Sequence, residues 1–98
     1  MITSQRWARL SLSEQFGHVG SEISRARHWD EKKDVAGCEK ALERALELLD
    51  LTIADRRWQK RLKEIVRLRE VVSDHLAKTR YYDVPLDSLE KYCIRFVA

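Results

Sequence analysis

Positive side chains are concentrated in one short stretch of the chain, RRWQKRLKEIVRLR, which spans Arg56 to Arg69 and holds seven cations and one carboxylate. Four of the cations recur at spacings of four, three and four residues, and two more flank them. In chain order the six are Arg56, Arg57, Lys60, Arg61, Lys63 and Arg67. Residues at such spacings share one face of a helix, and a row of cations can follow a phosphate backbone or an acidic protein surface. We therefore predict a surface that binds nucleic acid or an acidic protein, with Trp58 placed to stack a base.

The same charges have a second interpretation within the chain itself. Glu39, Glu43 and Glu47 recur every four residues, so they form a line of carboxylates on the preceding predicted helix. An adjacent antiparallel helix could pair these carboxylates with cations of the basic stretch. The predicted surface is then either open to a partner or neutralised internally, and the sequence leaves both alternatives open.

A resemblance to a known family concerns the end of this region, RLREVVSDHL, where Arg69 precedes His75 with five residues between them. The pair resembles the Arg and His of HEPN domains, which are small helical bundles of prokaryotic toxin–antitoxin systems and RNA-processing nucleases. The resemblance implies an RNA-cleaving site at a dimer interface, in which Arg69 stabilises phosphate charge and His75 acts on the 2′-hydroxyl or the leaving group. An HEPN-like ribonuclease or toxin–antitoxin component is therefore an alternative function.

The remaining reactive side chains do not form a metal or cofactor motif. Cys38 and Cys93 are far apart and lack a CxxC partner, and two thiols cannot complete the four-ligand shell of a structural zinc site. Glu14 and His18 lie on an outward helix face, without the Glu-x-x-His motifs of a di-iron bundle. We expect no metal and no cofactor, and we interpret both cysteines as small core residues.

Four amphipathic helices must position these residues. A capping box of Ser11 and Glu14 predicts a helix over 11–31, and a second helix is predicted over 35–54. Asp55 predicts the N-cap of a third helix over 55–78, and Pro85 fits the first turn of a fourth, which continues to the C-terminus. A short leading helix is predicted within the first ten residues. The inward positions, at spacings of three and four, are Leu12, Phe16, Val19, Ile23 and Ala26; Val35, Cys38, Leu42, Ala45, Leu49 and Ile53; Trp58, Leu62, Ile65, Leu68, Val72 and Leu76; and Leu86, Leu89, Cys93 and Phe96.

Apolar helix faces joined by short turns predict an all-α fold, an antiparallel four-helix bundle that forms a single domain over residues 1–98. The composition, 44% hydrophobic and 36% charged with three Gly and one Pro, is typical of a helix-rich globular protein. No apolar run exceeds three residues, so we predict neither a membrane span nor a signal-peptide core, and we expect a cytoplasmic protein.

Small residues form a second line beside the apolar face of the first long helix. Ser13, Gly17, Gly20 and Ser24 follow the same four, three, four spacing. Glycine inside a helix costs about 1 kcal/mol relative to alanine, so two of them indicate close approach by another backbone. That backbone belongs either to a second copy of the chain, which predicts a homodimer, or to another helix of the same chain.

The chain as a whole resembles a family of small prokaryotic helical-bundle proteins of uncharacterised role, through the segments GSEISRA and ERALELLDLTIAD. This resemblance implies the fold. The prediction for function is a non-enzymatic interaction module that uses the basic face, with the HEPN-like ribonuclease as the first alternative and a purely structural subunit as the second.

Overall fold

The computed structural model describes residues 3–96, which contain only helices and their connections. In chain order the elements are α1 (Ser4–Trp7), α2 (Leu12–Glu31), α3 (Val35–Ile53), the 3-10 helix η1 (Arg56–Arg61), α4 (Leu62–Ala77) and α5 (Leu86–Ile94). The all-α prediction is confirmed, and so is the short leading helix. The final helix ends at Ile94 instead of continuing, and residues 97–98 lie outside the described part.

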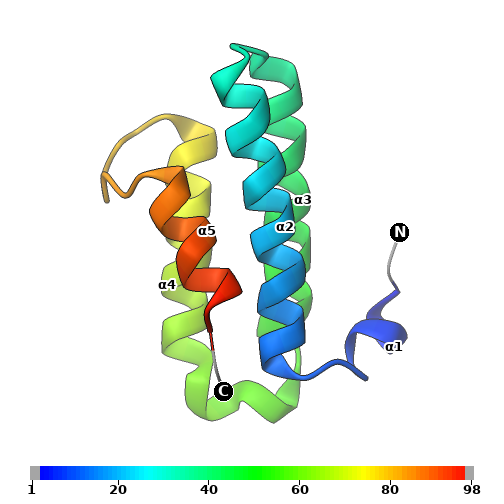
Figure 1. The fold of residues 1–98 in the computed structure, drawn as a ribbon. Coiled ribbons are helices and arrows are strands. Elements are labelled where there is room, and N and C mark those ends of the chain that lie inside the picture. Colours follow the sequence, from blue (N-terminus) through cyan, green and yellow to red (C-terminus); the bar gives the residue numbers. More distant parts are fainter. Residues whose placement is uncertain (1–2, 97–98) are drawn as a thin grey trace.

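The four longer helices pack against one another around one apolar core. α2 and α3 lie side by side, α4 packs against α3, and α5 packs against α2 (Figure 1). Most of the predicted inward positions are buried or half-buried. The buried apolar side chains of the core are Leu12, Phe16, Val19, Ile23, Ala26, Ala41, Leu42, Ala45, Leu49, Ile65, Leu68, Val71, Val72, Leu89 and Cys93. The prediction was wrong for Val35, which is 54% exposed because it occupies the first turn of α3, beyond the reach of the neighbouring helices.

Local hydrogen bonds begin the two central helices where the sequence predicts. Ser11 Oγ accepts from the amide of Glu14 at 3.1 Å, and Glu14 Oε1 accepts from the amide of Ser11 at 2.9 Å, which confirms the capping box. The hydrogen bond from the Ser11 amide also lowers the pKa of the Glu14 carboxyl. At the start of α3, Asp34 Oδ1 accepts from the amide of Gly37 at 2.9 Å.

The third predicted helix is not continuous, and this part of the prediction was wrong. Residues 56–61 form the 3-10 helix η1, and Trp58 within it has φ −104° and ψ 21°, outside helical values. The α-helical conformation begins only at Leu62. Asp55 does cap the segment, because its side chain accepts from the amide of Arg57, but the helix that it caps is η1. The chain therefore crosses the end of the molecule before α4 begins (Figure 1).

One ion pair links each pair of helices that pack closely. Glu22 of α2 binds Arg44 of α3 at 3.1 Å, and Arg27 of α2 binds Glu90 of α5 at 2.7 Å. Asp50 of α3 binds Arg69 of α4 at 2.6 Å. Within residues 3–96, no ion pair joins α4 to α5.

A shallow apolar hollow of about 290 Å³ separates α4 from α5. Its lining includes Leu68 and Val71 of α4 and Leu89 and Tyr92 of α5. α5 is therefore held mainly by α2.

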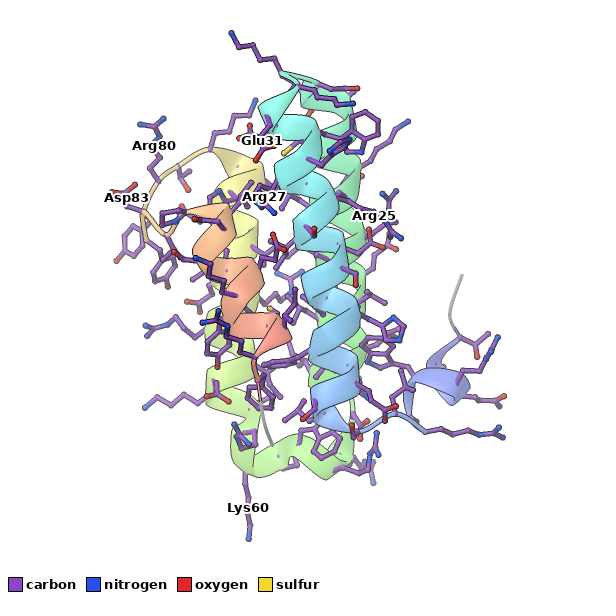
Figure 2. All side chains as sticks on the ribbon, in the orientation of Figure 1. Arg25, Arg27, Glu31, Lys60, Arg80 and Asp83 are labelled. Atoms are coloured by element: carbon purple, nitrogen blue, oxygen red, sulfur yellow. The ribbon has the colours of Figure 1, made fainter. Side chains whose placement is uncertain are left out.

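The connection from α4 to α5 is fixed by one carboxylate. Asp74 accepts hydrogen bonds from the hydroxyl of Thr79, from the amide of Tyr81 at 2.7 Å and from the amide of Tyr82 at 3.1 Å. These donors, Thr79 first, hold the pKa of Asp74 below its usual value. The connection has positive φ angles at Lys78, Arg80 and Asp83, and the last two side chains extend away from the protein (Figure 2).

None of the helices in the described part of the chain combines the length and apolar character that a membrane crossing requires.

Candidate functional site

The basic stretch is held in place by a buried glutamine. Gln15 of α2 is 0% exposed, and its side-chain amide donates to the carbonyl oxygen of Trp7 at 2.9 Å and to Asp55 Oδ2 at 3.3 Å. Gln15 Oε1 accepts from Trp58 Nε1 at 3.1 Å, while Trp7 Nε1 donates to Thr52 Oγ1 at 3.0 Å. The N-terminal segment, α2, the end of α3 and η1 are thus joined in one polar network.

The sequence interpretation missed Gln15, although its position carries a signal. Gln15 is three residues after Leu12 and four before Val19, so it lies on the apolar face of α2. A polar side chain buried on such a face needs hydrogen-bond partners, because leaving it unsatisfied is costly. Its partners, however, come from segments remote in sequence, which periodicity does not reveal.

Arg57 is committed to contacts within the protein. Its guanidinium donates from Nε to Asp55 Oδ1 at 3.0 Å and from Nη2 to Asp55 Oδ2 at 2.7 Å, and Nη2 also donates to the carbonyl oxygen of Leu10 at 2.7 Å. This hydrogen-bonded pair lowers the pKa of Asp55 and raises that of Arg57. The guanidinium lies 4.4 Å from the ring centroid of Trp58. The Trp58 ring, which we predicted to stack a base, is therefore already in contact with the Arg57 guanidinium.

Arg61 is similarly committed. Its Nη2 donates to Glu64 Oε1 at 2.6 Å, and its guanidinium lies 4.8 Å from the ring centroid of Phe96. The contact joins the residue segment that follows α5 to the end of η1. Arg95, beside Phe96 in the chain, is an exposed cation that the sequence interpretation did not include. Nearby, burial and a hydrogen bond with Glu64 raise the pKa of Tyr92 to about 12.

Three cations of the stretch have no partner within residues 3–96. Arg56, Lys60 and Lys63 are exposed, and their side chains take part in no ion pair, hydrogen bond or ring contact in that range. Lys60 projects away from the end of the molecule (Figure 2). We call these three residues the basic end. Arg67 lies farther along α4, where Glu70 is 3.8 Å away and the Tyr82 ring is 5.5 Å away.

The six predicted cations are therefore not one straight row. Because η1 interrupts the helix, Arg56, Arg57, Lys60 and Arg61 lie across the end of the protein, whereas Lys63 and Arg67 lie on α4. The alternative of internal pairing holds for half of the set, but with different acids. Among residues 3–96, Glu39, Glu43 and Glu47 form no ion pair, and the cations bind Asp55, Glu64 and Glu70 instead.

Arg69 and His75 have separate surroundings. Arg69 pairs with Asp50, which raises the pKa of the guanidinium, and lines a hollow beside Tyr81 and Tyr82. His75 Nε2 is hydrogen-bonded to the carbonyl oxygen of Val84 and lines a different hollow. Within residues 3–96, the two residues of the HEPN-like alternative thus line different hollows.

The line of small residues is partly covered by the chain's own α5. A Cβ atom at Gly20 would lie 3.1 Å from Cys93 Cβ and 3.0 Å from Ile94 Cγ1, so α5 approaches closely here. A Cβ atom at Gly17 would meet nothing within 4 Å. Ser13 and Ser24 are half-buried. Packing within the chain thus accounts for Gly20 and leaves Gly17 open.

Both cysteines are free thiols, and burial raises their pKa values, to about 12 for Cys93. The thiols are therefore protonated at neutral pH, which suits packing rather than nucleophilic chemistry. In the described part of the chain, no three His, Cys, Asp or Glu side chains are grouped so that they could hold a metal ion.

Comparison of this chain with protein-family models, with curated proteins and with solved structures gave no match.

Proposed function

We propose that the protein is a cytoplasmic, non-enzymatic interaction module, an antiparallel four-helix bundle whose basic end binds nucleic acid. The observation that supports this function is the charge balance of residues 55–70. Each of the three carboxylates of this segment is already paired with an arginine, Asp55 with Arg57, Glu64 with Arg61 and Glu70 with Arg67. The basic end thus has no acidic partner within residues 3–96, which supports its use for an external ligand. The two free thiols suit a reducing compartment.

Nucleic acid is favoured over an acidic protein because of what surrounds the cations. The exposed residues of η1 are all polar, namely Arg56, Arg57, Gln59 and Lys60. Protein–protein interfaces bury an apolar core within a polar rim, and η1 offers no such core. A phosphate backbone needs only cations at intervals.

The size of the effect follows from the number of unpartnered cations. Three contacts with duplex phosphates predict a slope of about −2.7 for log K against log salt concentration. A fourfold rise in salt should then weaken binding about 40-fold.

The test is fluorescence anisotropy with a short labelled DNA duplex, titrated at several salt concentrations. Wild type should bind with this slope, and the variant Arg56→Gln/Lys60→Gln/Lys63→Gln should lose binding. A matched control, Lys32→Gln/Lys33→Gln/Lys40→Gln, removes the same charge from exposed lysines that form no ion pair within residues 3–96. Absence of binding at low salt, or equal weakening in both variants, would contradict the proposal.

Self-association remains a separate part of the prediction. Gly17 is the position of the small-residue line that has open space beside it, so a second copy could approach there. Gly17→Leu should shift the mass measured by light scattering toward the monomer if this face forms a dimer. An unchanged mass would remove that interface.

A further inference from the structure

Two aromatic rings beside the basic end, those of Trp58 and Phe96, are covered by guanidinium groups. Trp58 packs against the core and carries the Arg57 guanidinium 4.4 Å from its ring centroid, and its Nε1 donates to Gln15. The Phe96 ring centroid lies 4.4 Å from that of the Phe16 ring and 4.8 Å from the Arg61 guanidinium. Both side chains are half-buried, and a guanidinium lies over each ring. Tyr92 of α5 is 41% exposed, but its hydroxyl is hydrogen-bonded to Glu64, so a carboxylate stands beside that ring.

Hydrogen bonds to other groups of the protein fix both of these guanidinium groups in place. Arg57 is fixed by Asp55 and by the carbonyl oxygen of Leu10, and Arg61 is fixed by Glu64. A base could reach either ring only after an ion pair had opened. Proteins that bind single strands without sequence preference combine cations with aromatic platforms on which bases stack. At the basic end, guanidinium groups cover the Trp58 and Phe96 rings, and the exposed Tyr92 ring stands beside the Glu64 carboxylate, which repels a phosphate.

Without stacking, affinity depends on the charge density of the ligand. A duplex carries one negative charge per about 1.7 Å of its axis, and a single strand carries one per about 3.4 Å. The same three cations therefore release more counterions from a duplex, with slopes of about −2.7 for the duplex and about −2.1 for the single strand. Charge alone favours the duplex.

We propose that the basic end recognises duplex nucleic acid through the phosphate backbone alone, without base stacking and without sequence preference. This inference rests on the proposed function, because it specifies the ligand of the same site. Arg56 and Lys60 contact the backbone from η1, and Lys63 contacts it from the first turn of α4.

The experiment compares three DNA probes on the full chain: a labelled duplex, a second duplex of shuffled sequence and the labelled single strand of the first. We expect the two duplexes to bind within about twofold of each other and the single strand to bind more weakly with a shallower salt slope. Tryptophan emission should not be quenched by the single strand at saturation, since the Trp58 ring face is closed to bases.

The outcomes separate the two proposals. Failure of all three probes to bind at low salt refutes the proposed function, and this inference with it. A preference for the single strand leaves the function intact and overturns the inference. So does quenching of tryptophan emission by the single strand, if this quenching is absent in Trp58→Phe. A large difference between the two duplexes also overturns it, because a contact limited to phosphates cannot read sequence.

Discussion

Replacing Gln15 with leucine should destabilise the protein and loosen the segment that carries the basic end. The change leaves Trp58 Nε1 without its acceptor and the Trp7 carbonyl oxygen without the Gln15 donor. The Trp7 carbonyl oxygen still accepts from the Leu10 amide at 3.1 Å, so only the Trp58 indole N–H is left unsatisfied. That group costs about 2 kcal/mol and the lost hydrogen bond to the Trp7 carbonyl costs about 1 kcal/mol, while burial of the leucine side chain returns about 1.5 kcal/mol. We expect a net loss of about 1.5 kcal/mol in the free energy of unfolding.

Urea denaturation followed by circular dichroism measures this loss without relying on tryptophan emission. With an m-value of about 1.3 kcal/mol/M, the midpoint should fall by about 1.2 M. Gln5→Leu is the matched control, because Gln5 is exposed in α1, and such a surface change should stay within about 0.5 kcal/mol.

A double-mutant cycle tests the assignment of the hydrogen bond itself. Trp58→Phe removes the Nε1 donor, so Gln15→Leu should cost about 1 kcal/mol less in that background than in wild type. Wild-type stability in Gln15→Leu, or the same cost in both backgrounds, would refute the claim that Gln15 anchors η1.

Three further predictions concern other parts of the molecule. Gly17→Ala should raise stability by up to about 1 kcal/mol through helix propensity, while Gly20→Ala should be less stable than Gly17→Ala because its Cβ meets α5; thermal denaturation of the two variants ranks them, and the reverse order would contradict the packing described. Because the pKa of Asp74 is lowered in the folded protein, its ionised carboxylate stabilises the fold fully above about pH 3.9, the usual aspartate pKa. This stabilisation is lost as the pH falls through the lower pKa of the folded state. Wild type should therefore have a higher urea midpoint than Asp74→Asn at neutral pH, and the difference between the two midpoints should become smaller below about pH 4. A difference that does not change with pH would refute the stabilising role of the Asp74 carboxylate. His75→Ala and Arg69→Ala should leave duplex affinity within about twofold, since neither belongs to the basic end, whereas cleavage of RNA by wild type that His75→Ala abolishes would favour the HEPN-like alternative.

Local patterns predicted the helices well because their determinants are local. The capping box depends on two residues three apart, Ser11 and Glu14, and both of its hydrogen bonds are present. Apolar spacing likewise identified the buried positions, since one face of each helix contacts the core. Val35 was placed wrongly because periodicity cannot tell where a neighbouring helix stops covering a face.

The break at η1 depends on contacts that are remote in sequence. Local periodicity favours a continuous helix through Trp58, but its indole also binds Gln15, 43 residues earlier. Arg57 meanwhile reaches the carbonyl oxygen of Leu10, 47 residues earlier. Such tertiary hydrogen bonds override a preference that is worth only tenths of a kcal/mol per residue, about 0.7 at most for ordinary residues.

The candidate site was predicted in its residues and not in its pairing. The pairs of Arg61 with Glu64 and Arg67 with Glu70 are three residues apart, so the sequence could have indicated them. The pair of Arg57 with Asp55 forms in η1, which the sequence interpretation took for the first turns of a continuous α-helix capped by Asp55. The pairing of Arg57 therefore could not be predicted without the break.

The reactivity of the Cys93 thiol can report local opening of α5. The thiol is 0% exposed on α5, and α5 is a nine-residue helix that leans on α2, with a hollow on its other side. A thiol reagent can reach Cys93 only while α5 is detached from α2. The labelling rate therefore measures how often α5 opens. It would show whether α5 detaches on its own, at a lower free-energy cost than the unfolding of α2 and α3.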